Sequence, residues 1–138
     1  MIYNMIYNII KNYAIFDISI YFYHRIIHNF DFHVKHHEDY LLKNNNNDIL
    51  DDVALISGPL TLIPTISYYN RGYITKNAKQ QLFYWTLAGI MHPLLHKYDM
   101  KYPPLSYLKD RHKDHHKYPD TKFGPVTPCM DILFGTEY

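Results

Sequence analysis

The order of apolar and polar positions along the chain predicts five helices separated by short polar breaks. Residues 29–31 predict a bend, residues 43–48 a polar loop, and residues 70–79 a polar turn around Gly72. The turn-rich tail, residues 123–138, is expected to fold back over the helices as a cap. The sequence therefore predicts an all-α fold, whose helices cover residues 2–28, 33–42, 53–69, 82–95 and 105–117.

Two of these segments carry no charged residue and form the most lipid-like part of the chain. Residues 53–69 and 82–95 are predicted to run out and back as a helical hairpin, although each is shorter than the ~20 residues that usually span a bilayer. Pro59 and Pro64 predict kinks, which membrane helices tolerate better than soluble ones. Residues 2–22 are long enough to span but include polar residues, so an interfacial or packed helix is equally open. These features predict a compact integral-membrane helical domain with a transmembrane hairpin.

Composition narrows the class of protein without identifying its chemistry. The 138 residues predict one domain over residues 1–138. The 14 Lys and Arg residues nearly balance the 13 Asp and Glu residues, so long-range electrostatics do not favour a nucleic-acid partner. A single cysteine, Cys129, excludes an internal disulfide and a metal site built from thiolates. The sequence also lacks the Gly-x-Ser-x-Gly setting of a nucleophilic serine and a glycine loop for phosphate.

The histidines carry the candidate chemistry, because all 10 fall into four clusters. Within the clusters the spacing is i,i+4 or i,i+3,i+4, which places side chains on one face of a helix. Imidazole is a good metal ligand, whereas a face of imidazoles makes a poor core and a poor lipid-facing surface. The predicted metal ligands are His24, His28, His33, His36, His37, His92, His96, His112, His115 and His116.

The number of histidines predicts more than one metal ion. One zinc ion needs about four ligands, so ten imidazoles fit two ions with four or five nitrogens each. A shell of imidazoles suits iron, copper or zinc, and the residue types leave the choice of metal open. Four nearby carboxylates are expected to orient the N–H groups of the ligands, or simply to be solvated. They belong to Glu38, Asp39, Asp110 and Asp114.

The predicted hairpin explains how the histidine clusters meet. It returns His92 and His96 to the side of the molecule where His37 lies, and the Pro103–Pro104 break lets the last helix fold across them. Lysine and arginine are more frequent on that side than in the opposite loop, which favours a cytosolic histidine face. The ten histidines are therefore expected to converge on two metal ions a few ångströms apart.

These motifs resemble those of the fatty acid hydroxylase superfamily, which includes sterol desaturases, sterol methyl oxidases and related lipid oxygenases. The segment His24-Arg25-x-x-His28 is similar to the first histidine box of the family. The segment His33-x-x-His36-His37-Glu38 is similar to the second box, and His92-x-x-x-His96 resembles the pair at the end of the membrane hairpin.

The C-terminal block strengthens this resemblance, because it is similar to the last histidine box and the terminal signature of the family. All the matching motifs together cover about residues 22–138. The block comprises His112-Lys-Asp-His115-His116-x-x-Pro119, Phe123-Gly124 and Asp131-x-x-Phe134-Gly135-Thr136.

The resemblance implies a membrane-bound oxidoreductase in which the ten histidines hold two iron ions, with zinc able to replace iron in an inactive form. Such an enzyme would use O2 to hydroxylate or desaturate a fatty acyl chain, a sterol or a related lipid. Its electrons would come from a b-type cytochrome or a reductase. In a eukaryotic cell it would lie in the endoplasmic reticulum membrane with its histidines facing the cytosol.

Two departures from the family pattern keep other functions open. Only four residues separate His28 from His33, fewer than the family usually has, and the N-terminal membrane region is short. The chain is therefore expected to be a compact variant, a truncated one, or one that completes its membrane domain as a homo-oligomer. The alternatives to a lipid oxygenase are a non-catalytic metal-binding membrane protein and a structural module stabilised by zinc.

Overall fold

A computed structural model describes residues 2–41 and 48–138, and these residues form helices without any strand. All five predicted helices are confirmed, and the tail adds a sixth, short one. The predicted loop at residues 43–48 lies outside the described residues, except for Asp48, which begins a helix. The helices are α1 (Ile2–Ile27), α2 (Asp31–Leu41), α3 (Asp48–Arg71), α4 (Lys76–Lys97), α5 (Leu105–Lys117) and α6 (Cys129–Phe134).

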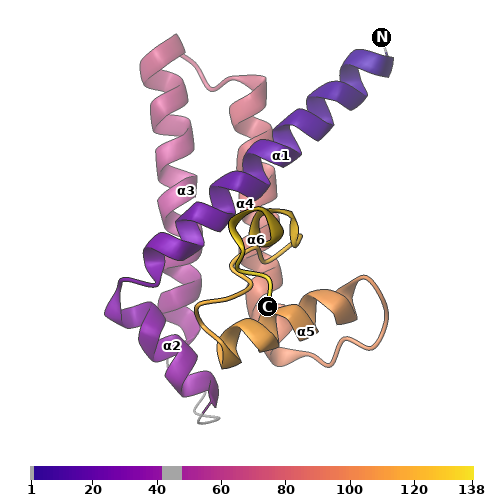
Figure 1. Cartoon of the computed structure of the whole chain (residues 1–138). Helices are drawn as coiled ribbons and strands as arrows, with labels where there is room; N and C mark the ends of the chain where they lie inside the picture. Colours follow the sequence, from indigo (N-terminus) through magenta and orange to yellow (C-terminus); the bar gives the residue numbers. More distant parts are fainter. Residues whose placement is uncertain (1, 42–47) are drawn as a thin grey trace.

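The helices are arranged around the hairpin of α3 and α4, which pack against each other along their length (Figure 1). Helix α1 crosses this hairpin obliquely and contacts α4, while its N-terminal end projects beyond the other helices. Helices α2 and α5 contact each other, and each also contacts one arm of the hairpin. The C-terminal segment returns to α1 through α6. One end of the molecule therefore gathers α2, α5 and the ends of α1 and α4.

The hairpin is confirmed, but its helices extend beyond the predicted boundaries and its turn is shorter. The hydroxyl of Thr75 accepts a hydrogen bond from the backbone N–H of Ala78 at 3.2 Å, so α4 begins directly after Thr75. The polar residues that follow are already helical, although the sequence pattern predicts a turn there. Helix α3 continues through both of its prolines. Gly72, with φ of +73°, lies just after its end.

Within residues 2–41 and 48–138, none of the helices combines the length with the apolar character that crossing a membrane requires.

The core lies where α1 crosses α4, and it fixes the direction in which both helices present their histidines. Phe16 and Ile20 are buried one turn apart on α1 and pack with Trp85 of α4. The rings of Phe16 and Trp85 meet edge to face with centroids 5.6 Å apart. His24 follows one turn after Ile20, and His92 follows Trp85 by two turns. On both α1 and α4, the helix face that is buried in the apolar core therefore continues to the histidines.

The predicted cap is also confirmed, because the C-terminal segment packs against the C-terminal half of α1. The ring of Phe134 stacks on Tyr21 with a centroid distance of 5.3 Å. The hydroxyl groups of Tyr21 and Thr136 form a hydrogen bond of 3.1 Å. Tyr21 itself is fully buried. The chain end therefore forms part of the wall beside the last turns of α1.

Candidate metal centre

All ten predicted ligands come together in two groups of five, and in each group one ligand atom per residue lies within 4.8 Å of the others. The two groups adjoin each other, since the ring centroids of His37 and His116 are 4.4 Å apart. The first cluster comprises His24, His28, His33, His37 and His115. The second cluster comprises His36, His92, His96, His112 and His116.

The division between the clusters follows the helices. Helix α1 supplies only the first cluster and α4 only the second, whereas α2 and α5 supply both. On α2, one turn separates His33 from His37 and both belong to the first cluster, while His36 turns toward the second. On α5, His112 and His116 belong to the second cluster and His115 to the first. Helices α2 and α5 therefore lie between the two sites and link them.

The ring nitrogens of each cluster converge as ligands of one ion would. In the first cluster the Nε2 atoms of His28 and His115 are 3.1 Å apart. In the second cluster, the Nε2 atom of His112 lies 2.9 Å from that of His96 and 3.1 Å from that of His116. Two nitrogens bound at about 2.0–2.1 Å to one ion at tetrahedral or octahedral angles lie roughly 2.9–3.4 Å apart. The clusters can therefore hold metal without large rearrangement.

Backbone carbonyl groups orient two ligands of the first cluster. The Nδ1–H of His24 donates to the carbonyl of Phe123 at 2.8 Å, and that of His115 donates to the carbonyl of Thr121 at 2.5 Å. Because a carbonyl only accepts hydrogen bonds, these contacts place the proton on Nδ1 and leave Nε2 with a free lone pair. Such outer contacts fix both the tautomer and the ring orientation of a metal ligand.

Burial favours the neutral form of several ligands of the first cluster, and neutral imidazole is the form that binds metal. Burial, followed by repulsion from His33 and His37, lowers the pKa of His28 to about 3. Burial, followed by repulsion from His33, also lowers the pKa of His37 to about 3. The pKa of His115 is lowered too, first by burial and then by its histidine neighbours. At neutral pH these nitrogens therefore keep their lone pairs for a cation.

The crowding of the ring nitrogens supports the same conclusion. The Nε2 atom of His112 has two other imidazole Nε2 atoms, those of His96 and His116, within 3.1 Å. Burying a polar atom without a partner costs free energy, and packing ten imidazoles together raises that cost. A cation in each cluster would give the converging nitrogens a partner. The residues present therefore fit a pair of metal ions.

The four carboxylates proposed as outer acceptors have different surroundings. Glu38 and Asp110 are exposed, and Asp39 is buried. Asp114 accepts a hydrogen bond from the Nζ of Lys122 at 2.7 Å. For the two histidines whose Nδ1 contacts are described above, backbone carbonyls perform the orienting role that the sequence assigned to carboxylates. Sequence reasoning missed this because any residue type supplies a carbonyl.

A buried ion pair between Arg111 and Asp131, a residue of the C-terminal block, supports the loop that carries these carbonyls. Asp131 is fully buried, and its Oδ2 atom lies 2.5 Å from Nη2 of Arg111. Arg111 directly precedes the ligand His112 on α5. Its carboxylate also accepts the backbone N–H groups of Phe123 and Gly124, each at 2.8 Å. Arg111 donates from Nε to the carbonyl of Gly124 at 2.9 Å. This network therefore ties α5, the loop and the chain end together around the first cluster.

Two glycines of the C-terminal block meet different requirements. A Cβ on Gly124 would lie 2.5 Å from the carbonyl oxygen of Thr127 and 2.8 Å from Oδ2 of Asp131, so a side chain does not fit there. Gly135 has φ of +68° and follows the end of α6, where a left-handed conformation is needed. Gly135 is therefore needed for its backbone angle, whereas the close approach of neighbouring atoms occurs at Gly124.

Tyr40 is a further neighbour of the second cluster that sequence reasoning did not select. Its ring lies over His116 with a centroid distance of 4.2 Å and is 5.1 Å from that of His96. Tyr40 lies one turn after His36 on α2, so the helical spacing that grouped the histidines also points to it.

The fold and the site together define a class: an all-α protein whose histidine boxes form two adjoining sites able to hold metal. The chain belongs to the fatty acid hydroxylase family, whose model matches residues 9–136. That range contains all ten histidines and the C-terminal block, and it confirms the resemblance found in the motifs. No curated protein and no solved structure shows a significant match to the chain.

Proposed function

We propose that the protein is a membrane-bound, O2-dependent oxidoreductase that hydroxylates or desaturates a lipid with two iron ions held by its histidine clusters. The observation that carries this proposal is the pairing of two five-histidine sites in a chain of the fatty acid hydroxylase family. When bound, iron supplies the activation of O2 needed to attack an unactivated C–H bond. Zinc, which has no redox chemistry, would fill the same sites in an inactive form.

The protein's own residues have three tasks in this proposal. The ten imidazoles bind the ions, and the depressed pKa values of His28 and His37 keep the nitrogens of these two ligands deprotonated at neutral pH. The carbonyls of Phe123 and Thr121 orient His24 and His115. The ion pair of Arg111 and Asp131 holds the loop that carries those carbonyls. Burial of the clusters limits the access of bulk water to the reacting centre.

The proposed partners follow from the proposed reaction. O2 and a fatty acyl, sterol or related lipid are the substrates, and a b-type cytochrome or a reductase supplies the electrons. Nucleic acid is not an expected partner, because the charges of the chain nearly balance. Self-association into a homo-oligomer is a further proposal.

We also propose that the α3–α4 hairpin attaches the protein to a membrane, with the histidines on the cytosolic side and, in a eukaryotic cell, in the endoplasmic reticulum. Large apolar side chains are exposed on both arms, for example Leu62, Ile66, Phe83 and Ile90. Extraction of membranes with alkaline carbonate tests this proposal. The protein should remain in the membrane pellet, and its release into the supernatant would contradict the proposal.

A change in the lipids of a host cell tests the proposed activity. Expression in a host that lacks its own sterol and fatty acid hydroxylases should yield a hydroxylated or desaturated lipid that depends on O2. A variant with His36 and His115 both replaced by alanine, which removes one ligand from each cluster, serves as the inactive control. A metal-loaded protein that yields no new lipid product would favour the alternative, a non-catalytic relative.

A second alternative, a structural module stabilised by zinc, makes a different prediction about metal content. Protein purified from iron-replete cells without air would contain zinc alone in that case. Iron in the clusters under the same conditions would exclude it.

A further inference from the structure

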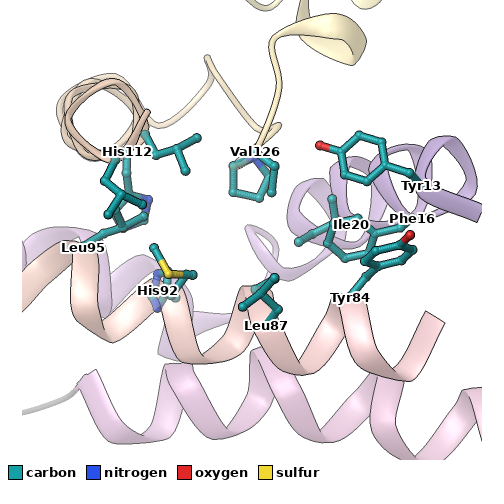
Figure 2. A pocket seen from close by; sticks show the side chains of 14 residues that line it. Tyr13, Phe16, Ile20, Tyr84, Leu87, His92, Leu95, His112 and Val126 are labelled. Carbon is teal, nitrogen blue, oxygen red and sulfur yellow. The ribbon is translucent and has the colours of Figure 1, made fainter. Parts of the chain in front are cut away.

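Two pockets reach the histidine clusters, and the side chains that line them differ in chemistry. The apolar pocket has a volume of about 240 Å³ and lies between α1, α4, α5 and the loop that carries Val126. Figure 2 shows His92 and His112 at one end of this pocket and Tyr13 and Tyr84 at the other. The pocket therefore leads from the second cluster toward the aromatic side chains of the core.

The apolar pocket meets only the second cluster, because both of its lining histidines belong to that group. None of its lining side chains is charged, and apart from the two imidazoles the only polar ones are the hydroxyl groups of Tyr13 and Tyr84. Burying an alkyl chain in such surroundings is favourable and leaves no charge desolvated. The volume lies below the roughly 300–1,000 Å³ typical of pockets that enclose a drug-sized ligand, so it suits a segment of an alkyl chain.

The charged pocket, with a volume of about 550 Å³, reaches the histidines from the side of the first cluster. Two of its three lining histidines, His28 and His37, belong to the first cluster, and the third belongs to the second. Its lining also includes charged side chains, namely Arg25, Glu38 and Asp120. An alkyl chain placed here would strip water from these charges, which is unfavourable. The charged pocket therefore suits water and proton exchange.

We propose that the two clusters have different tasks, an inference that rests on the proposed lipid oxidation. The alkyl segment that reacts enters the apolar pocket and meets the centre beside His92 and His112. The first cluster faces water through the charged pocket. Ala88, on the pocket wall beside the core, then determines how much of the alkyl chain fits.

Photochemical labelling tests this proposal without requiring turnover. Zinc-loaded protein in lipid nanodiscs is irradiated with a fatty acid that carries a diazirine within its chain, and the labelled residues are identified by mass spectrometry. The labels should fall on residues that line the apolar pocket, such as Met91 and Leu108. Ala88→Phe fills the pocket and should reduce this labelling about tenfold. Ile90→Phe adds the same ring at an exposed position of α4 and should leave labelling unchanged.

Metal content, measured on every variant, shows whether the protein still folds around its clusters. If Ala88→Phe loses zinc, the variant no longer folds around its clusters and is set aside. The positions labelled in the unchanged protein then show by themselves which pocket holds the alkyl chain. Labels on Val34 or Leu41, which line the charged pocket, would overturn the proposal, and so would the absence of labels from both pockets. Failure of the proposed oxidation is distinguishable, because it would appear as missing lipid products while labelling of the apolar pocket persisted.

Discussion

We expect that replacing both His24 and His28 by alanine lowers the metal content from two ions per chain to one and abolishes lipid oxidation. These residues are the whole contribution of α1 to the first cluster, and their loss leaves three imidazoles there. With three imidazoles in place of five, the first cluster should bind its ion much more weakly and lose it during purification. The second cluster keeps all five of its histidines and should retain its ion. Elemental analysis of the purified variant measures the result.

Two further double variants provide matched controls. Replacing His92 and His96 removes the contribution of α4 to the second cluster, and it should also leave one ion per chain. Replacing His24 and His92 removes the same number of histidines but leaves four ligands in each cluster, so it should retain more metal than either other variant. Equal metal loss in all three variants would show that the two groups do not act as separate sites.

We expect Asp131→Ala to destabilise the protein by about 3–5 kcal/mol, because it removes the fully buried partner of the Arg111 guanidinium and leaves that group only the partly exposed carboxylate of Glu137. The side chain of Arg111 is only 3% exposed and that of Asp131 is 0% exposed. The substitution also removes the acceptor for the N–H groups of Phe123 and Gly124, so the loop that orients His24 should loosen. Chemical denaturation of the zinc-loaded protein measures the stability, and elemental analysis should show that metal is lost.

A surface carboxylate supplies the control for this prediction. The side chain of Asp99 is 75% exposed and lies 3.9 Å from Lys101 and from Lys109. Exposed pairs of this kind contribute about 0–1 kcal/mol, so Asp99→Ala should leave stability and metal content nearly unchanged. If Asp131→Ala were as mild as Asp99→Ala, the buried network would not support the site as described.

The sequence predicts the helices well wherever local chemistry sets their ends. Helix α5 begins and ends at the predicted residues, Leu105 and Lys117, because prolines flank it on both sides. The prediction for the start of α4 was wrong, because its first turn consists of polar residues that resemble a loop. The capping hydroxyl of Thr75 explains why that turn is helical.

The sequence also indicates which residues form the candidate site, but not how they divide into two groups. Helical spacing places His33, His36 and His37 on one side of α2, yet a side chain turns by about 100° from one residue to the next. Which ring meets which cluster therefore depends on how the helices pack. The carbonyls that orient His24 and His115 were not predictable either. Every residue has a backbone carbonyl, so the residue type does not show which carbonyl contacts a ligand.

X-ray absorption spectroscopy of the iron-loaded protein, prepared without air, tests the paired metal centre most directly. The predicted spectrum shows four or five nitrogen neighbours for each ion, no sulfur, and a second metal about 3.5–4 Å away, the usual separation in two-metal sites. Elemental analysis of the same sample should give two ions per chain. One ion per chain, with no metal–metal scattering in its spectrum, would contradict the account.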